Sequence, residues 1–224
     1  MPDYRLAVCG YGKMGRLIEK LAPEYGFTVA CIVDETESSG DFVDLDVAVD
    51  FSVPHAVPGN VEKFAGLGVN TVVGTTGWLD QYDKVKSTVD RQDIGLIWSP
   101  NFSIGVNVFK RLVSEAARLL ANQPEYGAWA WEIHHATKQD SPSGTLLTLV
   151  KTMREAGYER SIDATASRAG AHPGTHEIGF DSAADTLTLR HTARSREGFA
   201  RGALHAAKWI IGKKGIHEFN ESLI

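Results

Sequence analysis

A glycine-rich turn between an apolar segment and an amphipathic one constrains the fold of this chain more than any other feature. Residues 5–9 (RLAVC) have the character of a buried strand, and residues 16–22 that of a helix. The turn between them has the spacing G-x-G-x-x-G, in which the glycines allow a tight turn, close approach of a pyrophosphate and close packing of the helix on the strand. We therefore predict that a dinucleotide is bound by Gly10, Tyr11, Gly12, Lys13, Met14 and Gly15.

An acidic residue follows at the distance that such a site requires. The second apolar segment, residues 28–33, ends at Asp34, which lies 19 positions beyond the last glycine of the turn. A carboxylate there binds the ribose hydroxyls, and Asp34 with Glu35 would repel an additional 2′-phosphate. No lysine or arginine follows before Lys63. The pattern predicts NADH in preference to NADPH, although Lys13 could reach a phosphate and leaves the use of both cofactors open.

Strands and helices alternate over the first hundred residues. After a polar loop at 36–46, we predict strands at 47–51, 69–73 and 94–98 and helices at 56–67 and 80–90. This order predicts right-handed βαβ units and a Rossmann-like parallel sheet. Ligands of such sheets bind at the carboxyl ends of the strands. Two strand-ending turns are therefore either cofactor contacts or turns without a ligand: Gly74, Thr75 and Thr76, and Ser99, Pro100, Asn101 and Phe102.

The pattern changes in the second half of the chain. We predict a long helix at 104–121, strands at 126–133, 162–167, 175–180 and 186–192, and helices from Pro142 to about Ala156 and at 199–211. Residues 186–192 alternate between polar and apolar, as in an antiparallel strand with one solvated face. The sequence thus predicts an α/β dinucleotide domain over 1–103, to which 199–224 returns, and a smaller α+β domain over 104–198.

The segment 132–145, EIHHATKQDSPSGT, concentrates the chemically reactive side chains. Two histidines end a predicted strand, Lys138 lies in the loop, and a helix is expected to start at Pro142 with Ser141 as its N-cap. The first backbone N–H groups of a helix attract anions, and nearby cations add to this attraction. We predict a carboxylate site with its own proton donors, in which the N–H groups belong to Ser143, Gly144 and Thr145.

The adjacent histidines allow more than one interpretation. Successive residues of a strand point to opposite faces, so at most one of His134 and His135 is expected to act directly. Both could instead be hydrogen-bonded structural residues. Glu132 beside them suggests zinc, but the spacing matches no helical metal pair such as HExxH, and we predict no metal. The other histidines show no obvious pairing in the sequence.

Composition excludes several classes of function. The net charge of −5 over 224 residues argues against a general binder of nucleic acid or anionic membranes. No apolar run approaches a membrane span, and the start at Met1 does not resemble a signal peptide, so a cytoplasmic location is expected. The only two cysteines, Cys9 and Cys31, lie in apolar runs and are predicted to be small buried hydrophobic residues.

The string E-x-H-H-x-x-K-x-D-x-P-S-G-T, together with the glycine turn and the GTTG and SPNF turns, resembles the 4-hydroxy-tetrahydrodipicolinate reductase family. The likeness covers nearly the whole chain, including residues 168–170, 174–176 and 199–211. It implies an enzyme of bacterial lysine and diaminopimelate biosynthesis that transfers hydride from NADH or NADPH to a cyclic unsaturated dicarboxylate. It also implies an N-terminal dinucleotide domain and a C-terminal substrate and tetramerisation domain, hence a homotetramer.

The resemblance also implies roles for single residues. His134 corresponds to the proposed proton donor or acceptor, Lys138 to a second proton donor, and His135 to a substrate contact. The turn of Ser143, Gly144 and Thr145 corresponds to the site of a substrate carboxylate. The segment between Asp34 and Val47 is shorter than in many members, which trims the first domain on the adenosine side of the cofactor site.

Two other interpretations remain open from the sequence. Another nicotinamide oxidoreductase, such as an amino-acid or sugar dehydrogenase, would share the glycine turn but lack the paired HHxxK and PSGT motifs. A nucleotide-binding regulator of the same fold, without enzymatic activity, would need no proton donor beside a carboxylate pocket.

Overall fold

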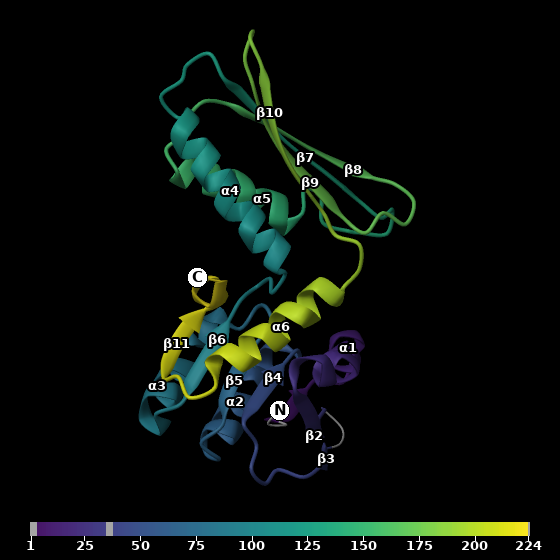
Figure 1. Cartoon of the computed structure of the whole chain (residues 1–224), viewed down its shortest axis with the longest axis vertical. Helices are drawn as coiled ribbons and strands as arrows, with labels where there is room; N and C mark the ends of the chain where they lie inside the picture. Colours follow the sequence, from purple (N-terminus) through teal and green to yellow (C-terminus); the bar gives the residue numbers. More distant parts are fainter. Residues whose placement is uncertain (1–3, 35–37, 224) are drawn as a thin grey trace. The chain divides into compact units, whose positions relative to one another are not determined.

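The chain divides into two compact units in a computed structural model that describes residues 4–34 and 38–223 (Figure 1). Unit 1 comprises Met1–Ile104 and Arg196–Ile224, and unit 2 comprises Gly105–Ser195. The boundaries expected from the sequence, after residues 103 and 198, lie one residue before the first break and three residues beyond the second. The last helix therefore belongs to unit 1.

Unit 1 is built on a seven-stranded sheet in the order β11-β6-β5-β4-β1-β2-β3. Its strands are β1 (Tyr4–Cys9), β2 (Phe27–Val33), β3 (Ser38–Gly40), β4 (Val47–Asp50), β5 (Asn70–Val73), β6 (Gly95–Trp98) and β11 (Gly215–Glu218). Neighbouring strands are parallel except β2 and β3. The strand order reverses between β1 and β4, which is where doubly wound sheets bind ligands. The prediction of a Rossmann-like parallel sheet is confirmed.

Helices cover both faces of this sheet, because alternate residues of each buried strand point to opposite sides (Figure 1). Leu6 and Val8 of β1 pack with α1 (Lys13–Leu21) and α6 (Glu197–Ile210). The intervening Ala7 and Cys9 pack with Phe64 of α2 (Val57–Ala65). Helix α3 (Tyr82–Gln92) lies beside α2. Short 3₁₀ helices occupy Ala22–Tyr25, Pro54–Ala56, Leu79–Gln81 and Phe219–Leu223.

The sequence prediction of unit 1 was wrong at both edges of the sheet. Residues 38–40, predicted as loop, form β3 and pair antiparallel with β2. β11 was missed altogether and pairs parallel with β6. Both are short edge strands, held by main-chain hydrogen bonds, and neither shows an alternating apolar pattern that sequence reasoning could detect. Cys9 and Cys31 are free and buried, as predicted.

Unit 2 is a four-stranded sheet in the order β10-β9-β7-β8, with two helices on one face. Its elements are α4 (Ile104–Leu120), β7 (Gly127–His134), α5 (Gly144–Glu155), β8 (Ile162–Arg168), β9 (Thr175–Asp181) and β10 (Thr186–Thr192). β7 and β8 are parallel, and the other neighbours are antiparallel, which confirms the prediction for 186–192. The core between helices and sheet includes Phe109, Leu149 and Ile178.

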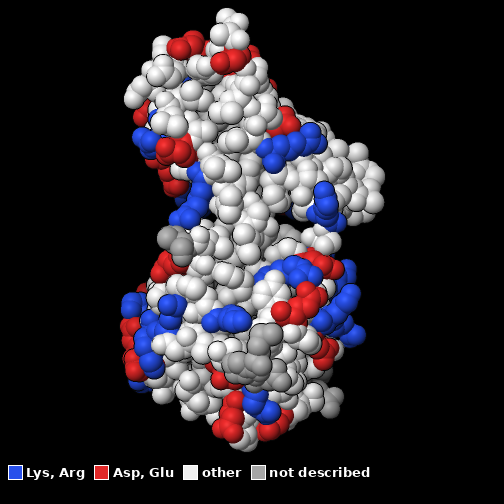
Figure 2. All heavy atoms as spheres, in the orientation of Figure 1, with Lys and Arg blue, Asp and Glu red and all other residues white. Residues whose placement is uncertain are grey.

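The surface carries charges of both signs. On the face shown in Figure 2, acidic and basic side chains are interspersed, without an extended patch of either sign. In the part of the chain that the structure describes, no helix combines the length and the apolar character that crossing a membrane requires.

One arginine closes the end of α4, and its removal tests the packing of unit 2. Arg160 donates to the carbonyl oxygens of Leu120 (2.9 Å), Ala121 (2.8 Å) and Tyr126 (3.1 Å). Because the last carbonyls of a helix otherwise lack partners, we expect Arg160→Ala to lower the free energy of unfolding by about 1–3 kcal/mol. Urea unfolding measures this, with the exposed Arg118→Ala as control; equal midpoints for the two variants would contradict it.

Candidate active site

The glycine turn of unit 1 has the geometry that its motif predicts. Gly10 has a φ of +81°, and a Cβ there would lie 2.4 Å from the carbonyl oxygen of Phe51. A Cβ on Gly15 would lie 2.2 Å from the carbonyl oxygen of Gly10, so the helix packs directly on the turn. A Cβ on Gly12 would meet nothing within 4 Å, and this residue is the N-cap of α1. The turn thus leaves open space at the positive end of the helix dipole.

Two adjoining pockets bring together most of the residues predicted to bind the cofactor. The first, of about 440 Å³, is lined by Gly12, Lys13, Met14, Phe51, Ser52, Pro54, Gly74, Thr75 and Thr76. The second, of about 210 Å³, is lined by Met14, Phe51, Gly74, Pro100, Asn101, Phe102, Arg196 and Phe199. Both open at the carboxyl ends of the central strands. Phe51, Ser52, Pro54, Arg196 and Phe199 were not predicted from the sequence.

Asp50 holds the walls of the first pocket in place. It ends β4 and is fully buried. Its Oδ1 accepts hydrogen bonds from the Oγ of Ser52 and the Oγ1 of Thr75, both at 2.7 Å, and its Oδ2 accepts from Asn60 at 2.7 Å. Its main-chain oxygen accepts from the N–H of Gly74 at 2.8 Å. Sequence analysis treated Asp50 only as part of a strand, although a carboxylate at the end of a buried strand is a usable signal.

The remaining predicted cofactor residues line neither pocket. Tyr11 donates to Glu19 and lies under the guanidinium of Arg16. Ser99 shapes its own turn, since its Oγ donates to the carbonyl oxygen of Asn101 and accepts from the N–H of that residue. Asp34 is exposed just beyond β2, and Glu35 lies outside the described residues.

In unit 2 the two adjacent histidines have different surroundings. His134, the last residue of β7, is buried, with 9% of its surface exposed. His135 is half-buried, and its Nδ1 forms a hydrogen bond with the Oγ1 of Thr137 at 2.8 Å. The Nζ of Lys138, in the loop that follows, lies 2.6 Å from an oxygen of Asp140. This ion pair lowers the pKa of Asp140.

The start of α5 differs from the prediction. The N-cap is Ser143, whose Oγ accepts from the N–H of Leu146 at 3.2 Å, and not Ser141. The helix begins at Gly144, two residues beyond the predicted Pro142. The N–H of Ser143 is also not free for a ligand, because it donates to Glu132 Oε1 at 2.8 Å. The prediction missed this because the partner of Ser143 comes from another element, β7.

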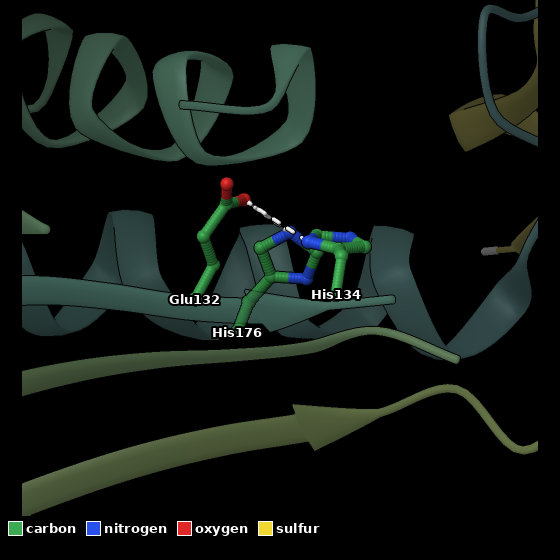
Figure 3. Close-up of side chains that lie close together, drawn as sticks. All are labelled: Glu132, His134 and His176. Atoms are coloured by element: carbon green, nitrogen blue, oxygen red, sulfur yellow. Dashed lines mark ion pairs between the residues drawn. The ribbon is translucent and has the colours of Figure 1, made fainter. Parts of the chain in front are cut away.

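Glu132 is the centre of the site in unit 2 (Figure 3). It is fully buried, and its Oε1 accepts from Arg168 at 2.8 Å as well as from the N–H of Ser143. Its Oε2 accepts from the Oγ of Ser143 and lies 3.3 Å from Nε2 of His176 and 3.6 Å from Nδ1 of His134. No role in the site was predicted for Arg168 or His176 from the sequence. Both lie opposite β7 residues in neighbouring strands: His176 opposite Glu132, and Arg168 opposite His134.

The protonation states follow from burial and from these contacts. Burial lowers the pKa of His176 to about 4, and the nearby His134 adds to this effect. Burial also lowers the pKa of His134, although Glu132 acts in the opposite direction. Burial of Glu132 by itself would raise its pKa, but the hydrogen bonds from Ser143 and Arg168 outweigh burial and lower it. These contacts therefore favour the ionised form of Glu132 and disfavour the charged form of both imidazoles.

The same residues raise the question of a metal ion. Ligand atoms of Glu132, His134 and His176 lie within 4.8 Å of one another, so His176 stands where the group considered from the sequence had His135. However, both oxygens of Glu132 already accept hydrogen bonds from Ser143 and Arg168. A metal ion would compete with these donors and stand close to the guanidinium, so the donor set suits a hydrogen-bonded network better. The absence of a metal remains a prediction.

The fold and the site together define a class. A doubly wound sheet with a glycine turn and open pockets at its switch point is the architecture of dinucleotide-dependent enzymes. The separate unit with buried histidines and a lysine-bearing loop is consistent with a substrate domain of an oxidoreductase.

Comparison with known proteins narrows this class to one family. The family described as "Dihydrodipicolinate reductase, N-terminus" matches residues 4–102, and "Dihydrodipicolinate reductase, C-terminus" matches residues 105–223. The chain therefore belongs to the dihydrodipicolinate reductase family.

Relatives over the full length agree with this assignment. The 4-hydroxy-tetrahydrodipicolinate reductase of Christiangramia forsetii is 36% identical, over 97% of each chain. That of Archaeoglobus fulgidus is 35% identical, over 98% of this chain and 99% of the relative. Among solved structures, a dipicolinate-bound dihydrodipicolinate reductase from Paenisporosarcina has a TM-score of 0.82 at 21% identity, covering 99% of this chain and all of that chain. At that identity the structural likeness supports the fold alone.

A glycine next to His134 provides a test of the site geometry. Gly174 has a φ of +130°, and a Cβ there would lie 3.0 Å from both Cδ2 and Nε2 of the His134 ring. We expect Gly174→Ala to displace this ring and to lower kcat at least about tenfold, by more than the backbone strain alone explains. The control is Gly170→Ala, also at a positive φ (+52°) but with nothing within 4 Å, where the backbone strain is smaller. Steady-state kinetics measures kcat of both variants. Equal losses of kcat would show that the contact with the His134 ring is irrelevant.

Proposed function

We propose that this chain reduces 4-hydroxy-tetrahydrodipicolinate to tetrahydrodipicolinate with a reduced pyridine nucleotide, in lysine and diaminopimelate biosynthesis. The observation that carries the proposal is the match of the two family halves over residues 4–102 and 105–223. Relatives that are 35–36% identical over nearly the whole chain bear the name of this reaction. The alternatives, an amino-acid or sugar dehydrogenase and a non-enzymatic regulator, explain the glycine turn but not the match of the second half.

We assign the cofactor to the pockets of unit 1. The nucleotide, when bound, supplies the hydride. The open N-terminus of α1 at Gly12, with Lys13 beside it, suits the pyrophosphate. The turns at 74–76 and 100–102 line the two pockets and are proposed as further cofactor contacts. Gly10 and Gly15 would contribute to cofactor binding through the shape of the turn. Tyr11 and Ser99 would contribute indirectly, through their hydrogen bonds with Glu19 and Asn101.

We assign the substrate to the segment between β7 and α5 in unit 2. Hydride addition to a conjugated imine builds electron density that must be protonated, and a positioned acid is worth roughly 10²–10⁴-fold in rate. His134 and Lys138 are the proposed proton donors, and the Lys138 ammonium also attracts a negatively charged substrate. Gly144 and Thr145 at the start of α5, with Ser143 as its cap, would bind one carboxylate, and His135 would contact the substrate.

The ligand of a structural relative supports this substrate class. The relative from Paenisporosarcina is described as bound to dipicolinate, a cyclic dicarboxylate. We propose a ligand of the same class here. A homotetramer is also proposed on the family resemblance, and a cytoplasmic location is proposed from the sequence.

Substitution of the proposed acids tests the reaction. In an assay with NADH and freshly generated 4-hydroxy-tetrahydrodipicolinate, we expect His134→Ala to lower kcat by about 10²–10⁴-fold with little change in cofactor affinity. Lys138→Ala should lower kcat and raise KM, because a donor and a cation are both lost. The control is Lys151→Ala, an exposed lysine on α5. Near-wild-type turnover of either variant would refute its role, and no oxidation of either NADH or NADPH by the wild type would refute the function.

Asp34 tests the proposed preference for NADH. Its exposed carboxylate just beyond β2 would repel a 2′-phosphate, so we expect kcat/KM to favour NADH and Asp34→Asn to reduce the ratio about tenfold, equivalent to ~1.4 kcal/mol. Asp44→Asn is the matched control, since Asp44 is also exposed and lies in the same short connection between β2 and β4. A wild-type preference for NADPH would contradict the proposal.

A further inference from the structure

The ring of His134 has a buried nitrogen without a partner. Its Nδ1 is inaccessible to solvent and has no hydrogen-bond partner in the described structure. Buried polar atoms of this kind are rare, because an unpaired group loses its hydration without compensation. The carboxylate oxygen Oε2 of Glu132 lies 3.6 Å away, just beyond hydrogen-bond distance. A small movement of the ring would pair the two atoms.

The sheet register explains why this carboxylate faces the ring. Glu132 and His134 are two positions apart on β7 and therefore lie on the same face. Other charged or titratable groups also face His134: Arg168 from β8, His176 from β9, and Lys138 and Asp140 from the loop after β7. Asp140 is exposed and paired with Lys138, so Glu132 is the buried carboxylate among these groups.

This arrangement matters when His134 carries a charge. An imidazolium that releases a proton from Nε2 keeps the proton on Nδ1 and needs an acceptor there. A buried carboxylate next to Nδ1 favours this tautomer and stabilises the charged ring, as the aspartate of a catalytic triad does for its histidine. The neutral His176 cannot supply a negative charge, and Arg168 opposes a second cation.

We propose that Glu132 is the positioning residue of the site: its Oε2 accepts the Nδ1 proton of His134, while its Oε1 fixes Ser143 at the start of α5. One carboxylate thus aligns the proton donor with the turn that binds the substrate carboxylate. The proton given to the substrate comes from Nε2 of the imidazolium, which returns to the neutral Nδ1–H form and is recharged from solvent. The inference rests on the proposed role of His134.

The pH dependence of kcat/KM separates this role from a purely structural one. Glu132→Gln keeps the shape of the side chain and one acceptor for Ser143 but removes the charge. The limb of the profile that requires protonated His134 should then move to lower pH by about one unit, because an opposite charge has been lost. Glu132→Asp should restore the limb in part. Arg168→Gln removes a positive charge from the same network and should move the limb to higher pH.

Controls make each outcome decisive. Glu177→Gln changes a carboxylate next to His176 in sequence, on the opposite face of β9, and should leave the limb in place. If Glu132→Gln does not fold, as judged by circular dichroism, the other two charge variants test the inference. Glu132→Asp should move the limb to lower pH by less than Glu132→Gln would, and Arg168→Gln should move it to higher pH. An unchanged limb in the charge variants would overturn the inference, whatever happens to kcat. Full activity of His134→Ala would instead remove the proposed acid, a distinct failure.

Discussion

A buried carboxylate governs the geometry of unit 2. Removing the charge of Glu132 from water is costly, and the protein compensates with the guanidinium of Arg168 and two hydrogen bonds from Ser143. These donors come from β8 and from the start of α5, so satisfying one charge joins three elements of the chain. Because the donors leave the carboxylate ionised, it also acts on the imidazoles of His134 and His176.

Unit 1 also has a buried carboxylate that is stabilised by hydrogen bonds from neighbouring segments. Asp50 is buried at the end of β4 and accepts hydrogen bonds from Ser52, Asn60 and Thr75. These residues belong to the loops that line the first pocket or to the helix beside it. In both units, a carboxylate at or near the carboxyl end of a strand fixes the loops that are proposed to bind ligands. Loops held in this way present their polar groups with little loss of conformational entropy on binding.

The charges of the proposed substrate site suit a carboxylate ligand. Burial lowers the pKa of both imidazoles, which disfavours their charged forms. The cations of the site are then Arg168, which Glu132 balances, and Lys138. Lys138 is in turn paired with Asp140. In the proposed function, an incoming dicarboxylate would compete with Asp140 for this ammonium.

Features that depend on a local pattern of residues could be predicted from the sequence. The glycine turn, the alternation of strands and helices and the segment 132–145 each consist of neighbouring residues whose spacing reflects one turn, strand or helix start. They were sufficient for the Rossmann-like sheet, the antiparallel strand at 186–192 and the family. The position of the α5 N-cap was missed by two residues, because Ser143 is selected by its bond to a distant glutamate.

Contacts between residues far apart in the chain are visible only in the folded structure. His176 and Arg168 join Glu132 through strand register, and Asp50 joins Thr75 across two parallel strands. The edge strands β3 and β11 exist because a partner strand offers free main-chain groups, not because of their own side chains. Strand pairing brings together residues far apart in the chain, and no periodicity within one segment encodes that choice of partner.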